Sequence, residues 1–454
     1  MASPARTAPA RPSRWIVNPV LARAPDSDLP AYWPLRHVLT LLVIGLPTVA
    51  LVFLVGAAIP GISPKHRSAY ALIAAVATPL WTYGTVFFGH ATAAFLVTSA
   101  WFLLLGLPES PARLSNGRAT LGGAVAGFAV ATEYPSILII SIVFATLLVR
   151  QTAIRFLVCA IVGAAVGLLP ALVYHQVAFG APWITGYSFK AASDFQAILG
   201  HGVFGISWPS IEGTWGILFG ARRGIFYYCP LLLLAPLGLL WMFRRRGWSD
   251  AGPILAASVF YILFAAGFVD WTAGWCAAAR HLVPILPLVV VAALFAAARL
   301  AERQWGVVIV VILISISGAN TVLTIALTPF FPPEFGAPLA QLVLPSLADG
   351  VAFANILSSA FGIPPPAVVV LTLCIVAATL IWATRRISRV RAWWLSATCL
   401  VTVIAVLLTY SWQGSAPPAE TELIRSQVLR RLGHAGVANS IEASFSPADA
   451  TVSD

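Results

Sequence analysis

Charged residues are scarce in this sequence of 454 residues, where they make up 9% of the total. A soluble domain carries roughly 25% charged residues, so this shortage excludes an ordinary soluble fold. Hydrophobic residues make up 59%, and the mean hydropathy is +0.89. The apolar residues form continuous runs of about 20 rather than alternating patterns, which predicts membrane helices and not a barrel. The expected fold class is an all-α polytopic membrane protein.

Metal-binding patterns are also absent from the sequence. The five cysteines have neither metal nor redox spacing, and most lie in apolar runs, where cysteine acts as a small buried hydrophobe. His90 and His281 lack a recognisable set of partner ligands, so the sequence predicts no metal site. We therefore expect no cofactor, while a requirement for a divalent metal and the oligomeric state both stay open. The first 36 residues also lack the apolar run of a cleavable signal peptide.

The chain divides into three parts: a Pro- and Arg-rich tail at 1–36, a transmembrane domain at 37–412, and a polar tail at 413–454. About 12 transmembrane or half-membrane helices are expected at 37–59, 69–88, 90–107, 119–131, 135–149, 154–178, 226–243, 251–270, 281–298, 304–328, 366–384 and 392–412. Segment 119–149 could form one long kinked helix or two short helices hinged at Thr132–Pro135, because Pro135 disfavours helix at Tyr134. The distribution of basic residues favours two short helices, since one long helix would place 11 of the 15 Lys and Arg residues of the basic loops outside. In the polar tail, 418–433 could form a short amphipathic helix, or the tail could be loosely ordered.

The distribution of basic residues orients these helices. With two short helices at 119–149, fifteen Lys and Arg residues fall in loops on one side, and only Lys190, Arg222, Arg223 and Arg280 fall in loops on the other. Cytoplasmic loops carry the excess of Lys and Arg, so the first side is predicted to be cytoplasmic. The net charge of +11 is explained by these short clusters and does not indicate nucleic-acid binding.

The loops at 179–225, 271–280 and 329–365 are thereby predicted to be extracytoplasmic. Arg222, Arg223 and Arg280 lie beside glycine and aromatic residues in the first two of these loops. The planar guanidinium of arginine suits phosphate, although a single such residue usually extends to lipid headgroups. Trp208, Trp215, Trp271 and Trp275 could stack on a sugar or belong to an interfacial aromatic belt.

Several stretches carry a family resemblance. They are Ala77–Gly84 with Phe88–Ala91, the glycine-rich Gly122–Thr132 before Tyr134–Pro135, Leu218–Phe226 before Cys229–Pro230, and Trp271–Trp275 with Arg280–His281. In order and spacing they resemble the GT-C superfamily of membrane glycosyltransferases, in particular members related to family 39 mannosyltransferases and to aminoarabinose transferases. The resemblance covers roughly residues 35–300. Segment 37–59 corresponds to the second span of that family, so the first span and most of the first outer loop would be lacking here.

The resemblance implies a polyprenyl-phosphate sugar donor, transfer on the outer face of the bacterial inner membrane, and inversion at the anomeric carbon. It also implies a catalytic Asp or Glu in the first outer loop, where only Asp26 and Asp28 stand near the expected position. The residue after Thr132 is often basic in the family, whereas here it is Glu133.

An inverting transferase needs a carboxylate to take the proton of the acceptor and cations to assist the departing phosphate. Asp26, Asp28 and Asp270 are the candidate carboxylates. Asp26 and Asp28 could equally belong to a solvated linker, and Asp270 could merely pair with Arg280. The candidate substrate-binding residues are Arg222, Arg223, Arg280, His281, Glu133, His90 and Trp271. Glu133 could alternatively pair with an outer arginine, and His281 is interpreted as a hydrogen-bonding neighbour of Arg280.

The leading hypothesis is a glycosyltransferase whose donor is a sugar linked to polyprenyl phosphate, so that its partners are this donor and the membrane lipid. The main alternative is a non-catalytic relative that binds lipid-linked sugar or accompanies an enzyme. A transporter is the third hypothesis, but paired repeats and ionisable residues at the middle of the membrane, which are common in transporters, are not seen in the sequence.

Overall fold

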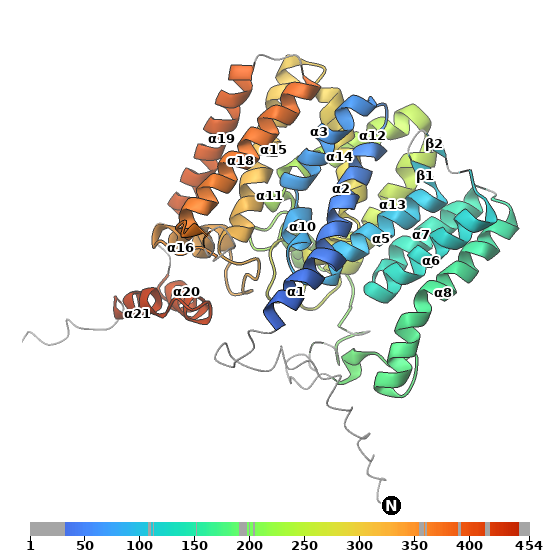
Figure 1. Ribbon diagram of the computed structural model, residues 1–454, viewed down its shortest axis with the longest axis horizontal. Helices are drawn as coiled ribbons and strands as arrows, with labels where there is room; N and C mark the ends of the chain where they lie inside the picture. Colours follow the sequence, from blue (N-terminus) through green and yellow to red (C-terminus); the bar gives the residue numbers. More distant parts are fainter. Residues whose placement is uncertain are drawn as a thin grey trace, which may run out of the picture.

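The structure is a computed structural model, and it describes residues 32–444 apart from 108, 109, 112, 151, 190–197, 199, 203, 204, 354–357, 359, 360, 389–391 and 414–417. The described chain is almost entirely helical, which confirms the predicted all-α membrane fold class (Figure 1). Asp26 and Asp28, two of the predicted catalytic residues, lie outside the described residues.

Among the described residues, 6 helices are long and apolar enough to cross a membrane. They are His37–Ala58, which combines parts of α1 (Tyr32–Thr40), η2 (Leu41–Gly45) and α2 (Leu46–Ala58), then α8 (Ile154–Phe179), α13 (Trp248–Ala266), α15 (Gln304–Ala326), α18 (Pro365–Ile387), and Trp394–Gln413 within α19 (Ala392–Gln413). Shorter apolar helices are α5 (Gly89–Leu104), α7 (Ser136–Val149), α14 (Leu286–Leu300), and Leu339–Ala348, which joins η6 (Leu339–Val343) and α16 (Leu344–Ala348).

Two segments predicted as single helices are broken. The segment predicted at 69–88 is divided into α3 (Pro64–Val76) and α4 (Leu80–Gly84), with Pro79 between them. The segment predicted at 226–243 is divided into α11 (Ile225–Tyr228), the 3₁₀ turn η4 (Pro230–Leu234) and α12 (Ala235–Arg246). Proline lacks the N–H that a helix interior needs and disfavours helical geometry in the residue before it, which explains both breaks.

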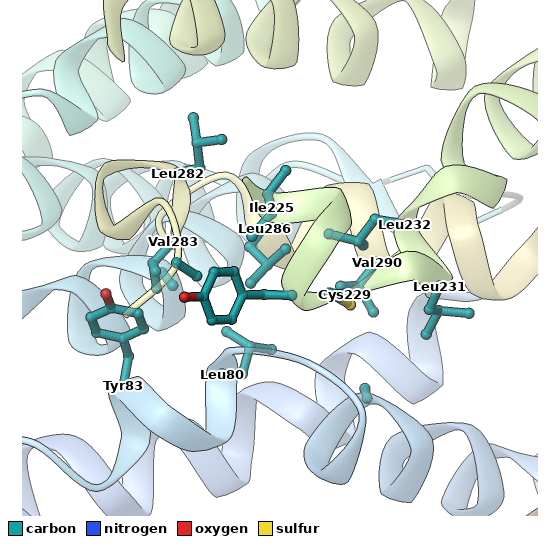
Figure 2. Packing of buried hydrophobic residues seen from close by; sticks show 14 of the residues in the cluster. Leu80, Tyr83, Ile225, Cys229, Leu231, Leu232, Leu282, Val283, Leu286 and Val290 are labelled. Carbon is teal, nitrogen blue, oxygen red and sulfur yellow. The ribbon is translucent and has the colours of Figure 1, made fainter. Parts of the chain in front are cut away.

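The broken segments meet in the core of the molecule. Figure 2 shows side chains of α4, α11, η4 and α14 packed together, among them Leu80 and Leu286, with Cys229 between α11 and η4. The Cys229 thiol donates to the carbonyl of Ala77, at the break between α3 and α4, over 3.2 Å. The N–H of Leu231 donates to Ser317 Oγ on α15, at 3.0 Å. Backbone groups freed by the breaks thus find partners inside the protein, as a membrane requires.

The predicted division of 119–149 is confirmed. Helix α6 (Asn116–Thr132) ends at Glu133, and α7 begins after Pro135. Helix α6 lies directly against α8 through small residues. A Cβ atom at Gly123 or Gly127 would lie 1.9 or 2.0 Å from a carbonyl oxygen of α8, and one at Gly163 or Gly167 would lie 2.0 Å from a carbonyl oxygen of α6. Only glycine permits this backbone approach, which is typical of small-residue packing between membrane helices.

The helices form a bundle with two distinct ends (Figure 1). We call the end with the short hairpin of β1 (Gly106–Leu107) and β2 (Ser110–Pro111) the inner end, after its predicted orientation. The outer end carries α4, α16, the 3₁₀ turns η3 (Gly186–Phe189) and η5 (Arg280–Leu282), and α10 (Ile211–Leu218). The predicted outer segment 329–365 is partly helical, with Phe331 and Phe335 fully buried.

The polar C-terminal tail forms two helices, α20 (Ala419–Arg431) and α21 (Ala435–Ala443), at the same end as α16 (Figure 1). The buried Arg425 pairs with Asp349, which follows α16, at 2.5 Å, and with Glu422 of α20 at 2.6 Å. Arg431 lies over the ring of Trp275 at 5.4 Å. Of the two alternatives for this tail, the helix is therefore present and docks on the outer end of the bundle, but Leu423 and Leu432 of the expected apolar face are exposed.

Candidate functional site

His90 and Glu133 lie side by side at the outer end. Helix α5 begins where α6 ends, since a Cβ atom at Gly89 would lie 3.4 Å from the carbonyl oxygen of Thr132. This arrangement places His90 Nδ1 2.5 Å from Glu133 Oε1, and each side chain is 13% exposed. Glu133 was expected either to bind substrate or to pair with an outer arginine, and the structure gives it a histidine as its close neighbour.

The geometry of this pair leaves polar atoms unused. The two atoms are as close as an ion pair, but their angles do not meet hydrogen-bond geometry, and His90 Nδ1 and Glu133 Oε2 are both buried without a hydrogen-bond partner. His90 Nε2 has no hydrogen-bond partner in the described chain and is not fully buried. A buried carboxylate oxygen without a partner is costly, which marks this position as more than packing.

His281 extends the cluster from η5. Its ring lies edge-on to His90, with centroids 6.1 Å apart, and stacks on Phe268 at 4.8 Å. Burial, followed by the charge of Arg280 and then by His90, lowers the pKa of His281 well below its usual value. His281 is therefore neutral at physiological pH. No hydrogen bond joins it to Arg280 in the described chain, so the interpretation of His281 as a hydrogen-bonding neighbour of Arg280 is wrong.

Arg280 is held beside this cluster by a constrained loop. Ala278 has a φ of 51°, which is unusual for a residue with a side chain, and the N–H of Arg280 donates to the Ala278 carbonyl at 3.1 Å. The guanidinium carbon lies 5.8 Å from the ring centre of Phe88, and Nε is buried without a hydrogen-bond partner. No ion pair joins Arg280 to Asp270 among the described residues, so the alternative of a structural pair is wrong.

Tyr187 of η3 brings the long loop after α8 to the same place. Burial raises the pKa of Tyr187, the Glu133 carboxylate raises it further, and Arg280 lowers it. The phenol therefore lies near both the carboxylate and the guanidinium. Its ring is also edge-on to Tyr134, with centroids 6.3 Å apart. Tyr134 in turn hydrogen-bonds to His175 of α8 at 2.8 Å, which fixes the wall of the site on that side.

Arg222 and Trp271 form a second group. The guanidinium carbon of Arg222 lies 6.0 Å from the Trp271 ring, and its Nε is buried without a hydrogen-bond partner. Trp271 packs on α10, since a Cβ atom at Gly216 would lie 2.3 Å from its ring. Arg222 and Arg280 thus lie on neighbouring loops of the outer end but over different aromatic rings.

Arg223 has a different environment from its neighbour. It is completely buried, and its guanidinium donates to four carbonyl oxygens, those of Thr272 (2.8 Å), Arg222 (3.0 Å), Gly274 (2.8 Å) and Phe331 (2.9 Å). Four of its five N–H donors are therefore occupied. This geometry does not support the predicted contact of Arg223 with substrate. Arg223 instead holds three outer loops together.

Asp270 lies in the loop that Arg223 holds. Its Oδ1 accepts a hydrogen bond from Thr272 Oγ1 at 2.5 Å, and its carbonyl accepts from the N–H of Ala273 at 3.1 Å. The carboxylate therefore orders its own loop, and no contact places it beside His90 or Arg280. Trp208 and Trp215 are largely exposed at 92% and 64%, as an interfacial belt would require, whereas Trp271 is partly buried.

The structure adds residues that the sequence did not single out. Tyr83 of α4 is buried and donates its hydroxyl to the Ala277 carbonyl at 2.5 Å, so it fixes the loop that carries Arg280. Phe88 and Tyr187 are the other two. Tyr83 and Phe88 lie within stretches that resemble the GT-C family, and this was the available signal. Within the described ranges, no group of three or more His, Cys, Asp or Glu side chains is placed to hold a metal ion.

A larger cavity of about 310 Å³ lies at the inner end. Its lining is mostly apolar and includes Trp101, Phe102 and Leu288, and the two charged residues of the lining, Arg150 and Asp250, are 3.8 Å apart. Unlike Arg222 and Arg280 of the outer end, the arginine of this cavity therefore has a carboxylate beside it.

Comparisons with known proteins give limited results. No protein-family profile matches the sequence, and no curated protein matches it. Among solved structures, ArnT from Cupriavidus metallidurans in the apo state has 15% identity and a TM-score of 0.46, covering 82% of this chain and 62% of that chain. ArnT from the same organism bound to undecaprenyl phosphate has 16% identity and a TM-score of 0.44, covering 86% and 66%. This chain therefore spans less than two thirds of the length of either structure.

Proposed function

We propose that this chain is a GT-C-type membrane glycosyltransferase. It takes a sugar from a polyprenyl-phosphate donor and transfers it, with inversion, to an acceptor on the outer face of the bacterial inner membrane. The observation that carries the proposal is the pair Arg222 and Arg280, each with a buried Nε that lacks a hydrogen-bond partner. A guanidinium that leaves donors unused in a buried site is poised for an anionic ligand, and phosphate matches its planar fork.

The outer end supplies the remaining requirements of such a reaction. Arg280 would hold the phosphate of the donor, and Arg222 on the neighbouring loop would provide a second cation for the departing phosphate. The ring of Trp271 beside Arg222 is available to the sugar or the lipid. Lys and Arg are otherwise concentrated in the predicted cytoplasmic loops, so these two residues are exceptions to the bias that orients the protein.

The first test is lipid binding. Undecaprenyl phosphate, the ligand in one of the compared structures, is titrated against the full chain in nanodiscs. We expect the Arg222→Ala, Arg280→Ala double variant to bind at least about tenfold more weakly, because a charge-assisted contact contributes roughly 1.5–3 kcal/mol. Arg299→Ala at the inner end, whose side chain is exposed and pairs with Glu302, is the matched control and should bind like the wild type. Equal affinity in the double variant would remove the proposed site.

The second test is transfer. Undecaprenyl phosphate carrying a radiolabelled hexose or pentose is offered to the full chain, and consumption of the donor is followed. Turnover that is lost in the double variant supports the transferase. Binding of undecaprenyl phosphate without turnover of any donor in the panel would instead assign the chain to non-catalytic binding of lipid-linked sugar.

A further inference from the structure

We propose that His90 is the catalytic base of the transfer and that Glu133 stabilises its protonated form, an inference that rests on the proposed transferase function. The pair combines a ring nitrogen that is not fully buried with a neighbouring carboxylate, and Arg280, which is proposed to hold the phosphate, lies over the adjacent Phe88 ring. The sequence suggested other carboxylates for this role, namely Asp26, Asp28 and Asp270.

The accessibility of individual atoms selects His90 over Glu133. His90 Nε2 is not fully buried and has no hydrogen-bond partner among the described residues, whereas Glu133 Oε2 is fully buried. A base must reach the proton that it removes, so the imidazole is the group that meets the acceptor. Glu133, 2.5 Å from Nδ1, is placed to stabilise the positive charge that the ring acquires. This division of roles follows the general arrangement in which a carboxylate supports a catalytic histidine.

Other nearby groups fit the role less well. Asp270 accepts the hydroxyl of Thr272 and has no contact with Arg280 or His90 in the described chain. His281 stacks on Phe268, at 4.8 Å between ring centroids, and lies next to the charge of Arg280, so a second positive charge on it is disfavoured. The groups that face His90 are Tyr83 from α4, Glu133 from the end of α6, and His281 with the nearby Arg280 from η5.

The proposed step balances without a further reactant. The acceptor hydroxyl oxygen forms a bond to the anomeric carbon as its proton moves to His90 Nε2. The bond between that carbon and the phosphate oxygen breaks, and the electron pair leaves with the polyprenyl phosphate, whose added negative charge faces Arg280. The proton on His90 is then released to water, which restores the neutral ring.

The first experiment measures His90 directly and requires no substrate. Diethylpyrocarbonate modifies neutral accessible imidazoles, and mass spectrometry of the full chain gives the rate at each histidine as a function of pH. We expect His90 to react, and the Glu133→Gln variant to change the pH profile of its reaction, because the neighbouring carboxylate charge is gone. His434 on the C-terminal hairpin is the internal reference and should not shift. An unreactive His90, or a profile that Glu133→Gln leaves in place, would overturn the proposal.

The second experiment measures turnover of the radiolabelled donor. His90→Gln is expected to lower kcat at least about 100-fold, since general base catalysis contributes about 10²–10⁴. Its binding of undecaprenyl phosphate should stay within twofold of the wild type. Glu133→Gln should retain partial activity with the acid side of its pH profile moved to lower pH. If His90→Gln keeps wild-type kcat, or if Asp26→Asn with Asp28→Asn removes that acid side, the inference fails while the transferase function stands. If the wild type turns over no donor, the proposed function itself fails.

Discussion

The two ends of the bundle treat arginine differently. At the inner end, Arg118 donates to the carbonyls of Leu103 and Phe102 at 2.8 and 2.9 Å, and Arg150 donates to the carbonyls of Leu105 and Ser249 and lies near Asp250. These contacts satisfy the free carbonyls at the end of α5, where the helix dipole also favours cations. At the outer end, Arg222 and Arg280 keep buried donors without hydrogen-bond partners.

Arg223 shows that position in the molecule does not by itself explain the difference. It is adjacent in sequence to Arg222, and yet its guanidinium donates hydrogen bonds to carbonyl oxygens, as the guanidinium groups of the inner arginines do. Unused donors are therefore a property of two particular side chains. The comparison teaches that a guanidinium becomes a candidate for ligand binding when the protein buries it without completing its hydrogen bonds.

The largest expected effect is a loss of stability that distinguishes Arg223 from Arg222. Arg223→Ala would leave carbonyls of three loops without their donor and open a cavity, so we expect a loss of more than about 3 kcal/mol in the free energy of unfolding. Thermal unfolding of the purified protein in detergent measures this as a drop in Tm and in folded yield. Arg222→Ala is the neighbouring control and should unfold close to the wild type. Equal Tm values for the two variants would remove the distinction.

The next effect concerns the helices that hold the site. Gly127→Leu places side-chain atoms where a Cβ would already lie 2.0 Å from the Ala164 carbonyl oxygen, so α6 must move away from α8. Overpacking of this kind costs about 1–3 kcal/mol. Gly117→Ala, at the start of the same helix with open space around it, is the matched control and should leave Tm unchanged or raised. Unfolding in detergent compares them, and a stable Gly127→Leu would show that the close approach is dispensable.

A smaller effect compares the two ends directly. Arg150→Ala removes hydrogen bonds that join α5, α7 and α13, and we expect a destabilisation of about 1–2 kcal/mol with unchanged binding of undecaprenyl phosphate. Arg280→Ala should give the reverse pattern, with weaker binding and little change in Tm. Measuring Tm and binding on both variants tests the contrast. It would be lost if both variants changed the same property.

The smallest expected effect is at the C-terminal hairpin. Arg431→Ala removes a cation–π contact with Trp275, which is worth about 0.5–1 kcal/mol at exposed sites. Single and double variants of Arg431 and Trp275 form a thermodynamic cycle in which a coupling of this size is expected. Additive effects would mean that the hairpin is held by Arg425 and its two carboxylates alone.

The sequence predicted the helical fold from hydropathy, which is a local signal. It predicted the division near Glu133 from Pro135 together with the distribution of Lys and Arg among the loops. It also included His90, Glu133, Arg280 and His281 among seven candidate substrate-binding residues, although it did not place His90 against Glu133. That contact depends on the start of α5 lying beside the end of α6, a tertiary arrangement with no local pattern. The breaks near Pro79 and Cys229 do have a local signal, in Pro79 and Pro230, but the hydropathy pattern averaged each pair of segments into a single span.

Arg222 and Arg223 illustrate the limit of motif reasoning. Both stand in the same run of residues, and both were assigned to phosphate from their charge and position. Which of them is turned into the protein is set by the distant Thr272 and Phe331, whose carbonyls accept hydrogen bonds from Arg223. Asp26 and Asp28 remain predictions, since they lie outside the described residues.

The glycines at the interface of α6 and α8 limit how far Glu133 can move relative to His90. At these glycines the two backbones are in direct contact, so rotamer changes cannot adjust the spacing between the helices there. Helix α6 ends at Glu133, the carboxylate beside His90. The position of that carboxylate therefore depends on the close packing at Gly123 and Gly127, one to three helical turns away. A methyl group added in the middle of this interface would push α6 away from α8 and so displace Glu133, at the end of α6, from His90.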